Sequence, residues 1–275
     1  MHIVKGDGTR EVFEAEKLER SLRRSGAAPN VAERVTQEIT ASVQDGMSTS
    51  EIYRRAFKRL HKEEKTLAAR YSIRRALLDM GPTGFPFEDY FCELMRAKGY
   101  EASVRQILKG RCVDHEVDVV LKKDGIAIGA ELKFHNTPGF KTDLKTALYV
   151  RARFTDIESY AADRKETCAV SEGWLVTNTK FTSQAAKYAE CAGIRLLGWS
   201  YPKEGNLSDL ITETGLYPIT VLTSISRKEE AALLAGQVTL CRDIAKDPEA
   251  LTRAGIAKRK HSEIVAESAR LCGLS

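Results

Sequence analysis

The spacing of apolar positions changes twice along the chain and divides it into three segments. In the first segment, two short alternating runs flank a Gly-Asp-Gly turn at residues 6–8, which predicts a β-hairpin. Four stretches with helical spacing follow, the first over residues 14–25 and the last over residues 65–79. A Gly-Pro-Thr-Gly run at residues 81–84 then interrupts the pattern and marks a boundary.

The second segment alternates helical and strand-like patterns. It begins with a helix over residues 86–98, whose Pro86 suits a first helical turn. The expected elements after it are strands at 101–108, 116–122 and 126–134, a helix at 142–164, a strand at 173–177, a helix at 183–192 and a strand at 194–199. Helices interleaved with strands predict an α/β domain with a mixed sheet.

The third segment reads as all-α, with short apolar helices broken near residues 235–237 and 254–256. We therefore expect a multidomain protein with a helical N-terminal domain carrying a β-hairpin, a central α/β domain and an all-α C-terminal region. The expected boundaries are residues 1–82, 83–205 and 206–275.

Composition limits the classes of partner and compartment. The chain has 275 residues, 43% of them hydrophobic, and a formal net charge of +5, a mild excess that is compatible with an anionic partner. No run is long and apolar enough for a membrane span, and the N-terminus lacks a signal-peptide pattern, so we expect a cytoplasmic protein. The six cysteines form no Cys-x-x-Cys pair, and we interpret them as reduced thiols: Cys92, Cys112, Cys168, Cys191, Cys241 and Cys272.

Candidate chemistry lies on a hairpin in the central segment. The dipeptide Asp124-Gly125 between two apolar runs predicts a two-residue turn. In that register Asp118 lies directly opposite Glu131, and alternation places Lys133 on the same face. A one-residue slip would turn Asp118 to the other face.

Two carboxylates opposite one another repel, and burial increases the cost unless a positive charge lies between them. A divalent cation such as Mg²⁺, which prefers oxygen ligands, would relieve this repulsion between Asp118 and Glu131. Lys133 would neutralise a phosphate or orient a water molecule. The small residues Gly129 and Ala130 would allow a ligand to approach the backbone closely. The alternative is a solvated salt-bridge cluster, which the spacing alone supports equally well.

A third carboxylate, Glu88, lies on the helix before the sheet. It shares an apolar stripe with Phe91, Cys92 and Met95, and a buried carboxylate there would need a partner. A solvated position on the flank of the helix is an equally good interpretation of Glu88.

The order of helix, strand, Asp118, Glu131-Leu132-Lys133, helix, strand and helix resembles the PD-(D/E)xK nuclease superfamily, and most closely its Mrr-type restriction endonucleases. The further similar stretches are residues 87–91, 98–100, 173–178, 181–182, 185–189 and 193–197. Two departures are Val117, where Pro is common, and Glu131, where many Mrr-type members carry Gln.

This resemblance implies an active site. Asp118, Glu131 and the Leu132 carbonyl would hold Mg²⁺ or Mn²⁺, and Lys133 would position the hydrolytic water. Glu88 matches the auxiliary helix carboxylate of the superfamily.

The N-terminal segment resembles the ATP-cone, a nucleotide-binding regulatory module, over residues 4–8, 12–13, 16–18, 21–22, 49–52 and 69–71. The resemblance implies that Lys5 and Lys17 contact the phosphates of ATP or dATP and that Phe13 lies near the pocket. Gly6 replaces a typical Arg, which removes one phosphate donor. The chain has no P-loop motif, so we expect sensing and not ATP hydrolysis. The alternative is a helical protein-interaction cap with solvated lysines.

The C-terminal segment resembles helix-hairpin-helix modules over residues 234–238 and 254–257. The resemblance implies that the turns at Gly236 and Gly255 donate backbone N–H groups to DNA phosphates. Lys258, Arg259 and Lys260 would add contacts that do not depend on sequence. Ala257 departs from the second Gly that is common in this family. A packing domain or an oligomer contact is an equally good interpretation of this segment.

These features together predict an Mg²⁺-dependent DNA endonuclease with an adenine-nucleotide sensor. The main alternative is a non-catalytic, nucleotide-controlled DNA-binding protein on a nuclease fold, and a further one is an RNA or junction-specific nuclease. The expected partners are DNA and an adenine nucleotide, and no membrane; a homo-oligomer is left open.

Overall fold

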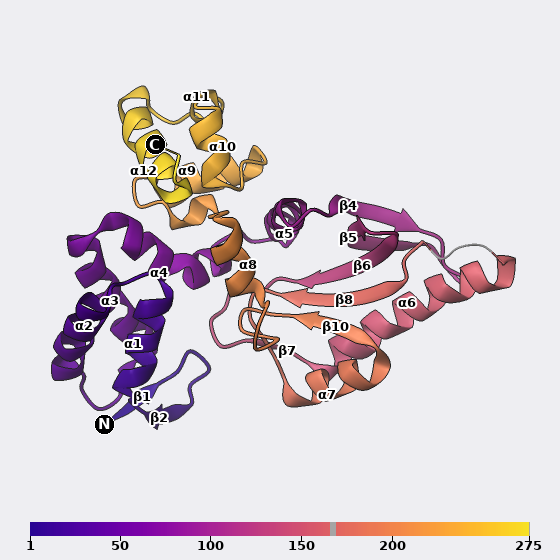
Figure 1. Cartoon of the computed structure of the whole chain (residues 1–275), viewed down its shortest axis with the longest axis horizontal. Coiled ribbons are helices and arrows are strands. Elements are labelled where there is room, and N and C mark those ends of the chain that lie inside the picture. Colours follow the sequence, from indigo (N-terminus) through magenta and orange to yellow (C-terminus); the bar gives the residue numbers. More distant parts are fainter. Residues whose placement is uncertain (166–168, 275) are drawn as a thin grey trace. The chain divides into compact units, whose positions relative to one another are not determined.

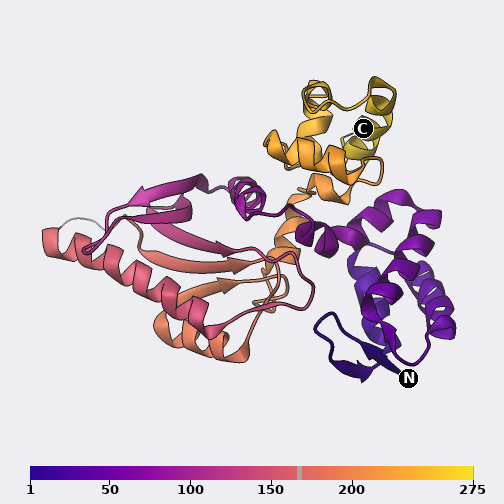
Figure 2. The ribbon, with the colours of Figure 1, turned by 180° about the vertical axis from the view of Figure 1, so that it is seen from behind.

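The computed structural model describes residues 1–165 and 169–274, so Cys168 and Ser275 lie outside the described residues. The chain forms two compact units (Figures 1 and 2). The first unit contains Met1–Asp79, Thr137–Gly139 and Tyr217–Ser275, and the second contains Met80–Asn136 and Phe140–Leu216. The five described cysteines are free thiols, as we expected.

The N-terminal part of the first unit contains the predicted hairpin and four helices around one apolar core. Strand β1 (His2–Val4) pairs antiparallel with β2 (Arg10–Val12) and parallel with β3 (Met47–Ser48). The sequence did not predict β3, because two residues are too short for any alternation to show. The helices are α1 (Ala15–Arg24), α2 (Pro29–Ser42), α3 (Thr49–Glu63) and α4 (Lys65–Leu78).

The C-terminal part of the first unit is helical, as predicted. Its elements are η1 (Ile219–Val221), α9 (Arg227–Ala235), α10 (Cys241–Lys246), α11 (Glu249–Arg253), η2 (Lys258–Lys260) and α12 (His261–Cys272). The buried carboxylate of Glu267 accepts hydrogen bonds from the backbone N–H groups of Thr223 and Ser224, at 2.8 and 3.0 Å. Those two bonds fasten α12 to the loop before α9.

The second unit is built on the mixed sheet that the alternating pattern predicted. Its strands lie in the order β10-β8-β6-β5-β4. The bounds are β4 (Glu101–Leu108), β5 (His115–Lys123), β6 (Ile126–Lys133), β8 (Glu172–Thr177) and β10 (Ile194–Leu197). Strands β4, β5 and β6 are antiparallel, whereas β6, β8 and β10 run parallel. A separate two-stranded pair, β7 (Lys141–Thr142) with β9 (Lys180–Phe181), was too short to predict.

Helices cover both faces of this sheet. Figures 1 and 2 show α6 (Leu144–Arg164) and α7 (Ser183–Ala192) on one face and α5 (Phe85–Ala97) on the other. The ring of Phe154 on α6 packs over β6 and β8, and the ring of Phe87 on α5 contacts Phe134 at the end of β6. Helix α8 (Leu207–Thr214) also belongs to this unit, where Tyr90 donates a hydrogen bond to the Leu216 carbonyl at 2.8 Å.

None of the helices in the described part of the chain is long and apolar enough to cross a membrane.

Candidate functional site

The predicted hairpin forms, in the predicted register. Asp124 and Gly125 make the turn with φ angles of 51° and 78°, the left-handed values that a two-residue hairpin turn requires. Lys123 pairs with Ile126 and Val119 with Ala130, so the next position places Asp118 opposite Glu131. The Asp118 carboxylate also accepts a hydrogen bond from the Leu132 backbone N–H at 2.7 Å.

Glu131 is a buried carboxylate with two cationic neighbours. Its side chain is 3% exposed. Lys133 Nζ lies 2.6 Å from Glu131 Oε1, and the Arg153 guanidinium contacts Oε2. A carboxylate with so little exposure is not part of a solvated surface cluster. The structure therefore excludes the solvated salt-bridge cluster, the alternative that the spacing supported equally well.

Burial and mutual repulsion shape the electrostatics of this cluster. The pKa of Glu131 is raised, first by burial and then by the charge of Asp118. Burial likewise raises the pKa of Asp118, against the lowering effect of the Leu132 N–H and of Lys133. Each carboxylate is therefore less stable when ionised than it would be in water, and additional positive charge would stabilise the pair.

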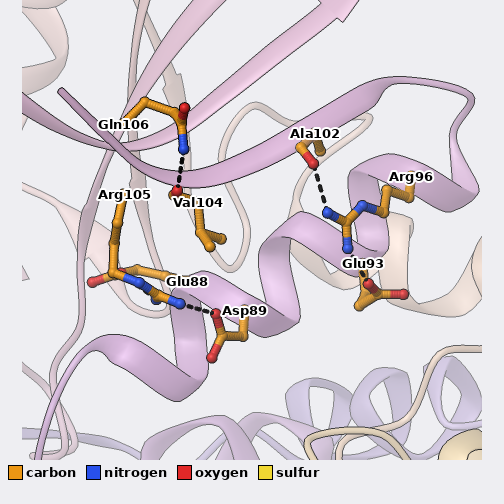
Figure 3. Close-up of polar contacts among 8 residues, drawn as sticks. All are labelled: Glu88, Asp89, Glu93, Arg96, Ala102, Val104, Arg105 and Gln106. Carbon is orange, nitrogen blue, oxygen red and sulfur yellow. Dashed lines mark hydrogen bonds and ion pairs between the residues drawn. The ribbon is translucent and has the colours of Figure 1, made fainter. Parts of the chain in front are cut away.

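Glu88 lies beside the same cluster and is buried, with 8% of its surface exposed. Burial, followed by the charge of Asp118, raises its pKa to about 7. Figure 3 shows the partner that its position required: Arg105 Nη1 lies 3.1 Å from Glu88, and Nη2 lies 2.8 Å from Asp89. Glu88, Asp118, Glu131 and Lys133 thus come together from one helix and two strands.

Arg105 reaches Glu88 through an uncommon backbone conformation. Val104 pairs with Val119 and Gln106 with Val117, so Arg105 occupies the position opposite Asp118, yet no pairing forms there. Its φ is 50°, the left-handed region, which costs a residue with a side chain about 1–3 kcal/mol. Residues with a strained backbone are often found at functional sites, and Arg105 lies next to a charged cluster.

The backbone after Lys133 is held by polar groups at the end of β8. Thr177 Oγ1 donates to the Lys133 carbonyl at 2.7 Å. The Asn178 side chain accepts from the His135 N–H at 2.9 Å and donates to the His135 carbonyl at 2.8 Å. Thr177 and Asn178 are both buried, so these bonds fix the direction in which β6 leaves the sheet.

The small residue beside the site has a packing role and not a ligand-binding one. A side chain at Gly129 would place its Cβ 2.4 Å from Cε1 of Phe154. The expectation that Gly129 leaves room for a ligand is therefore wrong, because the Phe154 ring already fills that space. Ala130 is fully buried, which excludes it as an approach path as well.

The donor set fits a hard divalent cation. The described residues contain no group of three or more His, Cys, Asp or Glu side chains arranged to hold a metal. Mg²⁺, however, is commonly held by one or two carboxylates together with water and phosphate oxygens. Asp118 and Glu131 supply two carboxylates whose ionised forms need added positive charge, and this chemistry suits such an ion.

Arg153 is the residue that the sequence did not reveal. It lies on α6, more than twenty residues after Glu131, and the expectation for that helix rested only on its apolar spacing. An Arg flanked by the apolar core positions Val150 and Phe154 was the available signal, because a cation close to a buried helix face needs an anionic partner.

In the first unit, the hairpin brings the expected nucleotide-binding lysines onto one carboxylate. Glu11 Oε2 lies 2.5 Å from Lys5 Nζ and 3.9 Å from Lys17 Nζ. Lys17 also contacts Glu14 at 2.8 Å. Phe13 is partly buried against the core of the same part. The two lysines therefore lie close together, with Glu11 as a shared partner.

The two turns that we expected to bind DNA phosphates differ in the position of their left-handed residue. Gly255 follows α11 with a left-handed φ of 70°, but Gly236 has a φ of −81°, and it is Gln237 that adopts 60°. Gln237 thus matches Gly255 in conformation, and Gly236 matches Ala254, whose φ is −79°. In the first turn, the glycine identified from the sequence therefore lies one residue before the left-handed position.

The basic run after the second turn divides into exposed and paired residues. Lys258 and Arg259 are exposed. Lys260, by contrast, places its ammonium group 2.5 Å from Glu229, which caps the start of α9. The first two residues of this run are exposed, whereas the charge of the third is paired with Glu229.

Three family models match this chain, in the order that the sequence indicated. They describe an ATP cone domain over residues 1–80, a restriction endonuclease domain over residues 80–199 and an AF1548-like C-terminal domain over residues 217–272. The chain thus carries a nucleotide-binding module and a nuclease-like domain.

Relatives extend this comparison beyond single domains. An uncharacterized protein of Archaeoglobus fulgidus is 38% identical over 181 residues, which are 66% of this chain and 98% of the relative. The crystal structure of AF1548, a protein of unknown function, matches with a TM-score of 0.58 and 36% identity, over 70% of this chain and 100% of that one. The chain therefore belongs to the AF1548-like proteins, as a member that combines an ATP cone domain, a restriction endonuclease domain and an AF1548-like C-terminal domain.

Proposed function

We propose that the protein is an Mg²⁺-dependent DNA endonuclease whose activity is regulated by ATP or dATP. The observation that carries the proposal is the buried Glu131 carboxylate, which lies beside Asp118 and in contact with Lys133 in a restriction-endonuclease-like domain. A buried cluster of this composition is expensive to maintain for stability alone. It matches the needs of phosphodiester hydrolysis, where metal ligands and a cation must lie at one point.

Asp118, Glu131 and the Leu132 carbonyl would hold the metal, with Mn²⁺ as a substitute. When bound, the ion supplies Lewis-acid stabilisation of the charge that develops on the phosphate and on the leaving oxygen. Lys133 holds the attacking water through its ammonium group, from a position on the same face as Glu131. Glu88, kept in place by Arg105, is an acceptor for a proton or a water at the edge of the site.

The first unit would supply regulation by nucleotide and additional contacts with DNA. Lys5, Lys17 and Phe13 form the proposed nucleotide site, and the turns with Lys258 and Arg259 form the proposed contact with DNA phosphates. Nucleotide changes the activity only if it binds the active and inactive forms with different affinity. A cytoplasmic location, where free thiols and DNA occur together, is part of the same proposal.

Cleavage of DNA tests this function directly. Supercoiled plasmid is incubated with the protein and Mg²⁺ or Mn²⁺, with and without EDTA, next to Lys133→Ala. Lys122→Ala is the matched control, because Lys122 is an exposed lysine on the same hairpin. We expect cleavage by the unaltered protein and by Lys122→Ala, and loss of at least about 100-fold in Lys133→Ala.

The other outcomes separate the alternatives. DNA binding without cleavage, equal in the unaltered protein and Lys133→Ala, would indicate a DNA-binding protein that keeps the nuclease fold. Single-stranded, duplex and branched DNA, together with RNA, are compared in the same assay. Preferential cleavage of RNA or of branched DNA would replace duplex DNA as the proposed substrate.

A further inference from the structure

We propose that Arg153 binds the scissile phosphate, and that its guanidinium exchanges Glu131 for that phosphate when a divalent cation binds the carboxylate. This inference rests on the proposed nuclease function and adds a catalytic residue from α6. It starts from three features of Arg153: its contacts, its unsatisfied donor and the charge that it brings to the site.

The contacts of Arg153 join it to the cluster through Glu131. Its Nη1 donates to Glu131 and to the Glu116 carbonyl, the latter at 2.8 Å, and its Nη2 donates to the Tyr149 hydroxyl. The side chain is 13% exposed, whereas Tyr149 is 52% exposed. Arg153 therefore connects the buried Glu131 carboxylate to an exposed aromatic residue.

These contacts leave part of the guanidinium unsatisfied. A guanidinium has five N–H donors in a fixed plane. The Arg153 Nε is buried and has no hydrogen-bond acceptor among the described residues. An unsatisfied buried donor is unfavourable, so this placement is not the one that best satisfies the group. A phosphate, which accepts two parallel N–H bonds from one guanidinium, would satisfy it better.

The charge of the site leads to the same conclusion. Asp118 and Glu131 carry two negative charges, and Lys133 and Arg153 carry two positive charges, so these side chains balance one another. A divalent cation then adds two positive charges. A phosphodiester carries one negative charge and gains a second as hydroxide attacks it. These four side chains, the cation and the dianionic transition state together carry no net charge, and only if Arg153 contributes its positive charge.

Exchange follows from the competition for Glu131. A divalent cation held by Glu131 would compete with the Arg153 guanidinium for this carboxylate. Arg153 would then need another anion, and the phosphate of a substrate bound to the same cation would supply it. A purely structural role for Arg153, which is to neutralise Glu131, would end when the cation binds.

The experiment compares Arg153→Ala and Arg153→Lys with the unaltered protein. Binding of Ca²⁺ or Mn²⁺ is measured by calorimetry, and DNA cleavage is measured at saturating Mn²⁺. We expect Arg153→Ala to bind the cation several-fold more tightly, because its competitor for Glu131 is gone. We expect its cleavage rate to fall by about 100- to 1,000-fold, as when one donor to a transition-state anion is removed. Arg153→Lys keeps a charge but not the two parallel donors, and its loss is smaller.

Chemical rescue and a matched variant complete the design. Guanidinium or ethylguanidinium in the buffer restores part of the cleavage by Arg153→Ala and none by Lys133→Ala. Arg151→Ala is the control, because Arg151 is on the same helix and pairs with Glu158 at 2.7 Å. It leaves both cation binding and cleavage unchanged.

Two results would overturn the inference. One is cleavage by Arg153→Ala within about threefold of the unaltered protein at saturating metal, a change of under about 1 kcal/mol. The other is weaker cation binding in Arg153→Ala. If the unaltered protein cleaves no DNA, the proposed function fails instead, and the cation-binding comparison still decides whether Arg153 and the metal compete. If Arg153→Ala does not fold, Arg153→Lys carries both measurements.

Discussion

The Asp118 carboxylate accepts a hydrogen bond from the Leu132 backbone N–H at 2.7 Å, across the hairpin that joins β5 and β6. This carboxylate fixes the strand that carries Glu131 and Lys133. In the proposed site, its other oxygen would bind the cation.

Two substitutions at Asp118 should separate these functions. Asp118→Asn keeps an acceptor for Leu132 and removes a buried charge, so we expect an unchanged or higher melting temperature. Asp118→Ala loses the acceptor and should lower stability by about 1–3 kcal/mol. Both should lose the rise in melting temperature that we expect Mn²⁺ to give the unaltered protein. An undiminished metal effect in Asp118→Asn would remove Asp118 from the proposed ligands.

Gly129 should resist even the smallest added side chain. Its Cβ in Gly129→Ala would lie 2.4 Å from Cε1 of Phe154, and we expect a loss of about 1–3 kcal/mol in the free energy of unfolding. Phe154→Leu in the same chain should recover part of it, because a smaller side chain makes room. Denaturant unfolding followed by tryptophan fluorescence reports on this unit, since Trp174 and Trp199 both lie in it. Equal losses with and without Phe154→Leu would contradict this explanation.

The sequence predicted the hairpin and its register because local chemistry determines both. Asp124 and Gly125 accept the left-handed angles of the turn, and the turn then aligns every pair back to Val119 and Ala130. The position of Asp118 relative to Glu131 was therefore available from the sequence. Burial of Glu131 was not, because it depends on the covering helix α6.

Contacts between residues that are far apart in the sequence account for the features of the site that could not be predicted. Arg153 meets Glu131 because α6 packs on that face of the sheet. Arg105 meets Glu88 from a strand position whose backbone is left-handed. The alternation of apolar and polar residues assigns side chains to faces on the assumption that the strand is regular. It therefore cannot predict a left-handed residue within a strand. Gly129 was misread for a similar reason, because a glycine pattern does not say which ring lies above it.

The stability of the second unit should depend on the protonation of Glu88. The folded pKa is about 7, above the ordinary value of 4.5, so the folded form keeps a proton that the unfolded chain releases. Stability is then fully present at low pH and falls as the pH rises from 4.5 towards 7. Glu88→Gln should reduce this fall by about 1 kcal/mol, because Arg105 and nearby solvent already stabilise part of the ionised form.

Tryptophan fluorescence is again the suitable measurement, because Glu230 in the first unit also has a pKa raised to about 7 by burial and would otherwise contribute the same trend. Denaturant curves at about pH 5 and about pH 8 give the dependence. Identical pH dependence in Glu88→Gln and the unaltered protein would show that Glu88 does not titrate in this range.

Nucleotide binding to the first unit should be limited by Glu11. We expect ATP or dATP at millimolar concentration to raise the melting temperature, and Lys17→Ala to abolish that rise. Glu11→Gln removes the carboxylate that Lys5 and Lys17 both contact, although Lys17 keeps its contact with Glu14. It should tighten nucleotide binding about two- to fivefold. Glu16→Gln, an exposed change on the same helix as Lys17, is the control. Calorimetry with the full chain measures the affinities, and weaker binding in Glu11→Gln would argue against a phosphate between the two lysines.

The basic run after Gly255 should affect DNA binding unevenly. Lys258 and Arg259 are exposed, and each phosphate contact that is lost should lower the slope of log affinity against log salt by about 0.9. Lys260 is held by Glu229 at 2.5 Å, so Lys260→Ala should lower stability and leave the slope nearly unchanged. Anisotropy of a labelled duplex in EDTA measures binding without cleavage, and Lys228→Ala, an exposed lysine on α9, is the control. The four variants compared are the alanine substitutions at Lys258, Arg259, Lys260 and Lys228. Removing an electrostatic contact with DNA must reduce the number of counterions released on binding. Equal slopes in all four variants would therefore mean that this part of the unit packs or oligomerises and does not hold DNA.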